Sequence, residues 1–262
     1  MRKAFLAAAL LLCALSVRAA ELKERIDRTF DVRPGAKVSL SNVNGGIKVT
    51  AWDQPRVRVI ADKEVHADSD DVKQALAALR VEMQPSNGGL VITTHYPKNG
   101  DGGGSLFDWL VGDHVSRNVE YELMVPRTMN IEIEDTNGSI RLSEVVGTHN
   151  LETTNGKIEV TRCGGAVEAS TTNGSIHAEL LTVAKGQPLR FHTTNGRIEV
   201  VVPPNFAADV DADTTNGSIS TDLPVATTHV ARNSLRGTIN GGGAPLRLRT
   251  TNGGIEIRTS GR

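Results

Sequence analysis

The sequence predicts an all-β protein, a β-solenoid with two short strands in each coil of about 19 residues. Three observations predict it. The segment Thr-Thr-Asn-Gly-x-Ile recurs along the C-terminal half, and apolar and polar residues alternate on both sides of each copy. Aromatic residues make up 3% of the 262 residues, whereas glycine occurs 26 times. A narrow interior of stacked coils favours β-branched and small side chains over rings.

The first 19 residues are predicted to be a secretory signal peptide. Met1–Lys3 is a basic start, Ala4–Leu15 is an apolar run too short to span a bilayer, and Val17–Ala19 is a small-x-small cleavage site. Cleavage after Ala19 would leave 243 residues with a formal net charge of −4. We therefore expect a bacterial protein that is periplasmic or secreted, with no transmembrane segment after signal cleavage. Nucleic acid is not an expected partner of this mildly acidic chain.

The two cysteines predict no disulfide. Cys13 lies in the signal peptide, where Leu12 occupies the position that lipid attachment reserves for a small residue, so Cys163 is left alone. Cys163 stands beside Gly164 just after a predicted strand. Because no histidine accompanies it on its coil, we expect an inert surface or turn thiol.

The repeats define the coils of residues 119–262. Seven glycines spaced 16 to 22 residues apart align the copies, and an isoleucine stands two residues after each glycine. Alternation places these isoleucines inside, as a core ladder of Ile140, Ile158, Ile176, Ile198, Ile219, Ile239 and Ile255. Asparagine and glycine tolerate left-handed backbone, so each Asn-Gly step predicts a corner. Stacked corners predict a turn ladder of Asn137, Asn155, Asn173, Asn195, Asn216 and Asn252.

The threonine pairs raise one alternative use of the corners. By alternation the first threonine of each pair points inward and the second outward. An outward threonine ladder suggests ice binding, but the ice-binding solenoids known to us place two threonines of a Thr-x-Thr motif on one face. Two adjacent threonines place only one hydroxyl on the outer face, so the repeats are better interpreted as structural turns than as an ice-binding surface.

Residues 20–118 are predicted to be the N-terminal part of the same solenoid, interrupted by inserts. Val38–Val49 and Val81–Ile92 repeat the template offsets. A helix is expected at about 68–80, where aspartates precede apolar residues at helical spacing, and a glycine-rich loop at about 98–105. We expect one continuous domain. The sequence assigns no role to the insert Asn99–Val111.

No catalytic, cofactor or metal site is predicted. The histidines fall on different repeat offsets, and no zinc, phosphate-loop or calcium-loop pattern occurs. His66, Asp68, Asp70 and Asp71 could chelate a metal, but helix capping accounts for the aspartates better.

An acidic strip is the one candidate binding face. Acidic residues recur four and six positions before the repeat glycine, on the outward side of the strands, as Glu132, Glu134, Glu152, Glu168, Asp211 and Asp213. A solvated face is the simpler interpretation. The alternative is a strip that binds a cationic surface or divalent ions.

The Thr-Thr-Asn-Gly-x-Ile repeats, the Val-Pro corner before a strand (Val125-Pro126 and Val202-Pro203) and the signal peptide resemble the bacterial "putative adhesin" family of β-strand-repeat proteins, a domain family of unknown function. The resemblance covers roughly residues 22–262. It implies a right-handed parallel β-helix-like fold and export to the envelope, and it implies no enzymatic activity.

These observations predict a non-enzymatic cell-envelope β-solenoid, an adhesin-like binding or structural module without a cofactor. Its partner would be an envelope protein or a polysaccharide. One alternative is a carbohydrate-active β-helix enzyme, although the acids are expected to be spread along the coils without clustered basic partners. A second is a self-associating scaffold, in which Ile255 and Ile257 of an uncapped C-terminal coil expose a strand edge. The last residues, 258–262, carry no sorting signal, which favours a soluble protein over surface display.

Overall fold

The computed structural model describes residues 20–67, 72–97 and 115–261. The predicted signal peptide, the aspartates of the predicted helix start and the Asn99–Val111 insert lie outside this part. The all-β prediction is confirmed: twenty strands and one short helix, α1 (Val72–Ala78), are described. Within these ranges no helix is long and apolar enough to cross a membrane.

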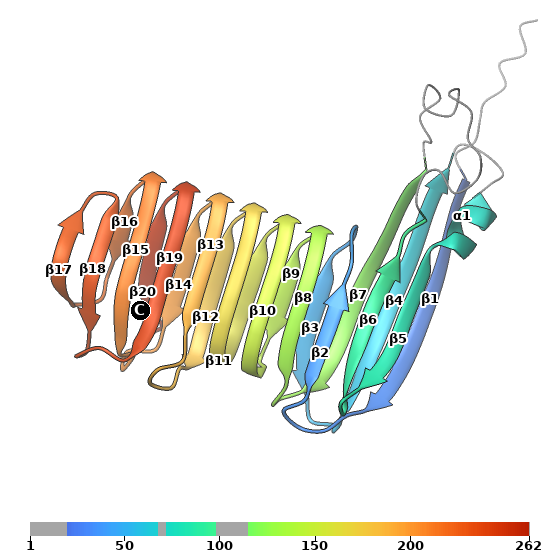
Figure 1. Cartoon of the computed structure of the whole chain (residues 1–262), viewed down its shortest axis with the longest axis horizontal. Coiled ribbons are helices and arrows are strands. Elements are labelled where there is room, and N and C mark those ends of the chain that lie inside the picture. The colour runs from blue at the N-terminus through green and yellow to red at the C-terminus, as the bar shows by residue number, and fades with distance from the viewer. Residues whose placement is uncertain (1–19, 68–71, 98–114, 262) are drawn as a thin grey trace, which may run out of the picture.

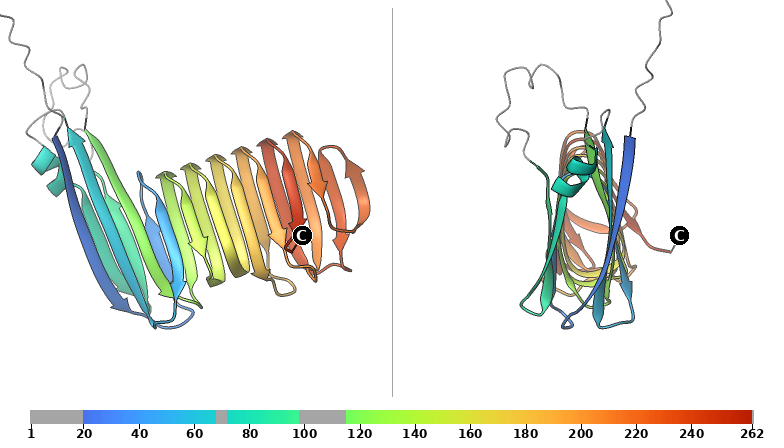
Figure 2. Two further views of the ribbon diagram at one scale, coloured as in Figure 1. Left: turned by 180° about the vertical axis from the view of Figure 1, so that it is seen from behind. Right: turned by 90° about the vertical axis from the view of Figure 1, so that its right-hand side faces the viewer.

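The strands form two layers that face each other across the core, as the end-on view of Figure 2 shows. We call the layer that leads into the Asn-Gly turns the entry sheet. Its strand order is β5 (Arg80–Ser86), β6 (Gly89–His95), β2 (Lys37–Ser41), β8 (Asn130–Asn137), β10 (Val146–Asn155), β11 (Ile158–Asn173), β13 (Leu189–Asn195), β19 (Ala244–Asn252), β15 (Ala208–Asn216), β18 (Ser234–Ile239) and β17 (Val225–Ala231).

The layer that leaves the turns is the exit sheet. Its strand order is β1 (Ala20–Asp31), β4 (Arg56–Ala67), β7 (Ser116–Pro126), β3 (Ile47–Trp52), β9 (Ile140–Ser143), the first part of β11, β12 (Ile176–Thr182), β14 (Ile198–Val202), β20 (Ile255–Thr259) and β16 (Ile219–Thr221). Neighbours in the middle of both sheets are parallel. Antiparallel strands lie at both ends of the entry sheet and at the β1 end of the exit sheet, whereas β16 at the other end is parallel to β20.

The core is a set of columns, because strands in register place like residues on top of one another. Ile140, Ile158, Ile176 and Ile198 pair in succession and are all buried. The interior also accepts larger or polar groups: Phe191 is fully buried in the entry sheet. His149 is buried as well, and burial lowers the pKa of its imidazole to about 4.

The last coil does not lie at the end of the stack. β19 is hydrogen-bonded between β13 and β15, and β20 between β14 and β16, as Figure 1 shows. The expectation that Ile255 and Ile257 expose an edge is therefore wrong: both are buried and have a paired strand on either side.

Two repeat copies form hairpins instead of coils. β17 and β18 are antiparallel around Arg232-Asn233, so Ile239 pairs with Ala208 and Val225 and lies outside the core ladder. β5 and β6 are antiparallel around Asn87-Gly88, where both residues have positive φ. This is the backbone that a two-residue hairpin requires. Consequently Leu90 of β6, not Val81 of β5, lies beside Val38.

Cys163 is buried in β11, which corrects the expectation of a surface or turn thiol. Arg162 and Gly165 have positive φ, and the register with β12 shifts here, so the chain bulges and turns the thiol inward. Burial raises the pKa of Cys163 to about 11, so it is protonated at neutral pH.

Candidate functional site

Three residues of each repeat build the turn: the inner threonine, the asparagine and the glycine. The threonine binds the neighbouring coil. Thr153 Oγ1 donates to the carbonyl of Gly138 (3.1 Å), and Thr171 Oγ1 donates to that of Gly156 (3.1 Å). The same bond joins Thr193 to Gly174, Thr250 to Gly196 and Thr214 to Gly253. Each buried hydroxyl thus satisfies a carbonyl of the neighbouring coil.

The asparagines form a continuous side-chain ladder. From the second member onward, each Nδ2 donates to the Oδ1 of the preceding member at 2.7 to 2.8 Å, in the spatial order Asn44, Asn137, Asn155, Asn173, Asn195, Asn252 and Asn216. Asn252 precedes Asn216 because β19 lies between β13 and β15. The asparagine side chains are largely exposed, so this edge of the stack presents a regular row of amides.

The glycines of the repeated turns allow neighbouring coils to approach each other closely. The sequence had suggested instead that they adopt left-handed backbone. Gly156 and Gly174 are not among the residues with positive φ. A Cβ atom built on Gly174 would lie 1.9 Å from the carbonyl oxygen of Gly156, and one on Gly156 would lie 1.9 Å from that of Gly138. A side chain would therefore hold adjacent coils apart.

Asp135 replaces the inner threonine where the N-terminal part meets the regular coils. It is 7% exposed, and neither carboxylate oxygen accepts a hydrogen bond of full geometry from the described residues, although the Thr136 N–H and the Asn42 side chain lie close to it. Burial raises the pKa of Asp135 to about 6, and the nearby charge of Glu120 adds to this. The backbone N–H of Thr136 and the side chain of Asn42 favour the carboxylate but offset only part of the increase.

The predicted acidic strip divides into two groups. Glu132, Glu134, Glu152 and Glu168 lie on the neighbouring strands β8, β10 and β11. Within this group Lys37 pairs with Glu132 (2.9 Å) and Arg190 with Glu168 (3.5 Å). Glu134 and Glu152 stand in direct register on adjacent strands, and both are exposed. Neither has an ion-pair partner among the residues that the structure describes.

Asp211 and Asp213 belong to a separate, neutralised group. β19 places Arg247 and Arg249 in register with them, and Arg249 pairs with both aspartates, at 2.7 Å from Asp211. Arg236 of β18 also contacts Asp211 (3.1 Å). The expectation of acids without clustered basic partners is therefore wrong here. In the sequence, Arg247 and Arg249 occupy the same repeat offsets as Asp211 and Asp213, and this could have indicated the pairing.

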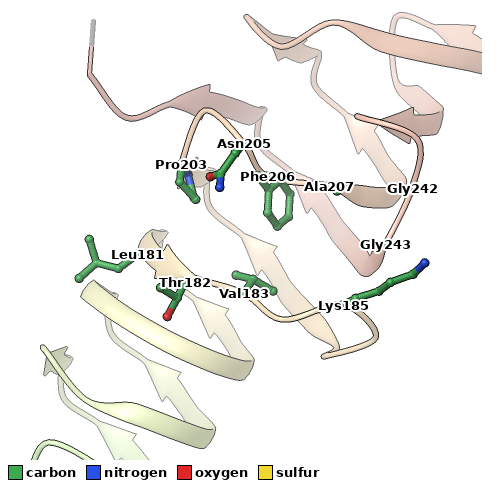
Figure 3. Close-up of a pocket in the computed structure, with 10 residues that line it drawn as sticks. All are labelled: Leu181, Thr182, Val183, Lys185, Pro203, Asn205, Phe206, Ala207, Gly242 and Gly243. Atoms are coloured by element: carbon green, nitrogen blue, oxygen red, sulfur yellow. The ribbon is translucent and has the colours of Figure 1, made fainter.

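A pocket opens where the connecting loops meet, at the edge away from the turns (Figure 3). Its walls are Leu181 and Thr182 at the end of β12, Val183 and Lys185 after β12, Pro203, Asn205, Phe206 and Ala207 after β14, and Gly242 and Gly243 before β19. Its volume is about 240 Å³, below the roughly 300–1,000 Å³ of ordinary ligand sites. Pro203 of the Val-Pro corner lines it, but none of the predicted turn-ladder, core-ladder or acidic-strip residues does.

The comparisons with known proteins concern the whole fold. The family model described as Toastrack DUF4097 matches residues 36–258. No curated protein matches. A "putative cell adhesion protein" from Clostridium sporogenes is 10% identical with a TM-score of 0.49, over 90% of this chain and 100% of that one. A "putative adhesin" from Bacteroides fragilis is 11% identical with a TM-score of 0.32, over 89% and 97%.

Proposed function

Because this chain belongs to the Toastrack DUF4097 family, whose model spans most of its length, we propose that it is a non-enzymatic, exported β-solenoid of the cell envelope that acts as an adhesin-like binding or structural module. The family resemblance drawn from the repeats is confirmed by this match. Export and a periplasmic or secreted location rest on the predicted signal peptide. The right-handed winding implied by the resemblance is part of the same proposal.

One observation carries the binding role. Glu134 and Glu152 project side by side from the paired parallel strands β8 and β10, and their flanking acids are already neutralised by Lys37 and Arg190. Two adjacent carboxylates on an exposed surface attract cations and orient a basic partner. We therefore place the contact surface on the outer face of β8, β10 and β11, with a cationic protein segment or cationic polymer as its ligand.

Charge reversal on the two sheets tests this surface. Binding of the purified protein to polylysine-coated beads is measured over a range of salt concentrations, because exposed charges are screened by salt. Glu152→Lys should weaken binding at low salt at least about tenfold. Glu179→Lys makes the same change of net charge on the exit sheet and should retain most of the binding. Equal losses in both variants would remove the entry-sheet surface from the proposal.

Self-association is the second candidate function, and the edge of β17 favours it. Among the described strands β17 pairs only with β18, and its sequence contains no Lys, Arg, Asp, Glu or Pro. The other ends are protected: β1 by many charges, β5 by Pro85, and β16 by its length of three residues and by the Ile219 N–H, which already donates to the Arg232 carbonyl (3.0 Å). An unprotected edge can pair with the same strand of a second copy.

Sedimentation velocity at increasing protein concentration tests the β17 edge. Association should be visible in the wild type and lost in Thr227→Lys, which adds the protecting charge that β17 lacks. Thr29→Lys on the already charged β1 is the control and should associate like the wild type. A monomer at all concentrations would eliminate this candidate.

A further inference from the structure

A ladder of ion pairs crosses the outer side of β1 and β4. Arg25 pairs with Asp62 through two bonds of 2.7 Å, Arg58 pairs with Asp27 (2.9 and 2.5 Å), and Arg56 donates to Asp31 (2.9 Å). Each of these rungs joins one cation to one carboxylate.

The last rung breaks this rule. The register pairs Glu21 with His66 and Lys23 with Glu64, and all four side chains lie on the outer side. Lys23 Nζ is 2.6 Å from Glu21 Oε1 and 3.2 Å from Glu64 Oε1, so one ammonium serves two carboxylates. With a neutral imidazole the rung carries one negative charge in excess.

The imidazole stands beside both carboxylates. His66 Nε2 is 3.6 Å from Glu21 Oε2 and 3.4 Å from Glu64 Oε1, and one potential ligand atom from each residue lies within 4.8 Å of the others. One imidazole nitrogen and two carboxylate oxygens at this spacing are a common ligand set for zinc and similar divalent metals.

We propose that Glu21, Glu64 and His66 form a binding site for a divalent transition metal such as Zn²⁺, which displaces the Lys23 ammonium. Two observations carry the inference: the three ligand atoms converge, and this rung alone, among the β1–β4 pairs described above, has more carboxylates than cations. A bound metal would tie the edge strand β1 to β4. The inference is independent of the proposed binding surface on the entry sheet.

Isothermal titration of the tag-free full chain with Zn²⁺ tests the site. His66→Ala and Glu64→Gln should each weaken binding at least about tenfold. Lys23→Met should tighten it, because the competing ammonium is gone. This gain, together with the loss in His66→Ala, distinguishes a metal site that uses the imidazole from a general attraction of Zn²⁺ to two carboxylates.

His95→Ala is the matched control. His95 Nε2 lies 2.9 Å from Glu82 Oε2 on the β5–β6 hairpin, an exposed histidine with a single carboxylate, so this variant should bind Zn²⁺ like the wild type. Wild-type binding no tighter than that of His66→Ala would overturn the proposal. Equal or weaker binding by Lys23→Met would also overturn it, since the metal and the ammonium would then not share oxygens.

Discussion

Asn252 donates its Nδ2 proton to Oδ1 of Asn195 at 2.7 Å, although 57 residues separate the two in the chain. The coil between them in sequence, with Asn216, lies beyond Asn252 in space. The C-terminal coil is therefore an interior layer of the stack, and this order determines how the molecule should respond to truncation and substitution.

The first prediction concerns deletion of residues 244–262. In an ordinary stack, loss of the last coil leaves the remaining coils paired. Here it removes β19 and β20 and leaves β13, β14, β15 and β16 with unpaired inner edges. We expect loss of the cooperative thermal transition measured by circular dichroism. Deletion of residues 261–262 is the control, and an unchanged transition in the longer deletion would contradict the interior position.

The second prediction concerns the core ladder. Ile176 is 1% exposed, between Ile158 and Ile198. Ile176→Asp buries an unpaired carboxylate and should unfold the chain or lower the free energy of unfolding by about 4 kcal/mol or more. Thr172, at the end of β11 before the same turn, is exposed, so Thr172→Asp should melt close to the wild type. Melting of Ile176→Asp at the wild-type temperature would show that the column is misassigned.

The third prediction tests the close approach of the coils. Gly174→Ala places a Cβ atom 1.9 Å from the Gly156 carbonyl, so the backbone must shift, at a cost of about 1–3 kcal/mol in chemical denaturation. Gly254→Ala is the control, because its Cβ would meet the nearest heavy atom at 3.4 Å. Equal effects of the two substitutions would argue against steric exclusion as the reason for the glycine column.

The fourth prediction is a pH dependence at Asp135. Its pKa is raised from an ordinary 3.8 to about 6, so the folded state holds the proton more tightly than the unfolded state. This contribution to stability is complete below pH 4 and is lost as the pH rises through about 6. The carboxyl of Asp135 also lies near the carbonyl of Gly45. A Cβ atom built on Gly138 would be 2.4 Å from Asp135 Oδ2 and 2.1 Å from Gly45 O, so the two oxygens flank the same point. A threonine at position 135 could therefore donate its hydroxyl to the Gly45 carbonyl.

Asp135→Thr should therefore raise the melting temperature more at pH 8 than at pH 4. The lowered pKa of His149 reduces stability toward acid in both proteins, so it cancels in the comparison. Thr172→Ser, which changes an exposed hydroxyl and no titratable group, should shift the melting temperature equally at the two pH values. A stabilisation by Asp135→Thr that is equal at both values would mean that the carboxyl does not titrate in this range.

The fifth prediction concerns Cys163, which is fully buried with a raised pKa. In a protein without residues 1–19, which lacks Cys13, a thiol reagent such as 5,5′-dithiobis(2-nitrobenzoic acid) should leave Cys163 unmodified in the folded state and react with it at once in denaturant. A Thr172→Cys variant supplies an exposed thiol on the same strand and should react without denaturant. Fast reaction of the wild type under native conditions would place Cys163 at the surface.

The repeat pattern predicted the all-β class and the inner and outer sides of the strands, because alternation of apolar residues such as Ile158 and Val160 depends only on local geometry. It could not predict the position of the last coil. The place of a coil in the stack depends on which strand edges pair with each other. Because all coils have similar strand edges, the sequence does not show which of them are neighbours. The hairpin at Arg232-Asn233 is what allows the chain to reverse and return between earlier strands.

The candidate surfaces were predictable only in part. The outward direction of Glu134 and Glu152 followed from alternation, and their adjacency followed from sequential stacking. Neutralisation of Asp211 by Arg249 depended on the inserted β19, which the repeat order concealed. The Glu21–His66 pairing joins residues from an antiparallel part of the exit sheet that does not follow the repeat.

The interior position of β19 also constrains how the chain is made. A ribosome delivers residues from the N-terminus, and segments that emerge early begin to fold first. β13 and β15 are synthesised before β19, and their direct pairing would be the ordinary next step of the stack. The slot between them must stay open, or close and reopen, until residues 244–259 have been synthesised. Insertion of β19 and β20 is thus a late step in the folding of this stack.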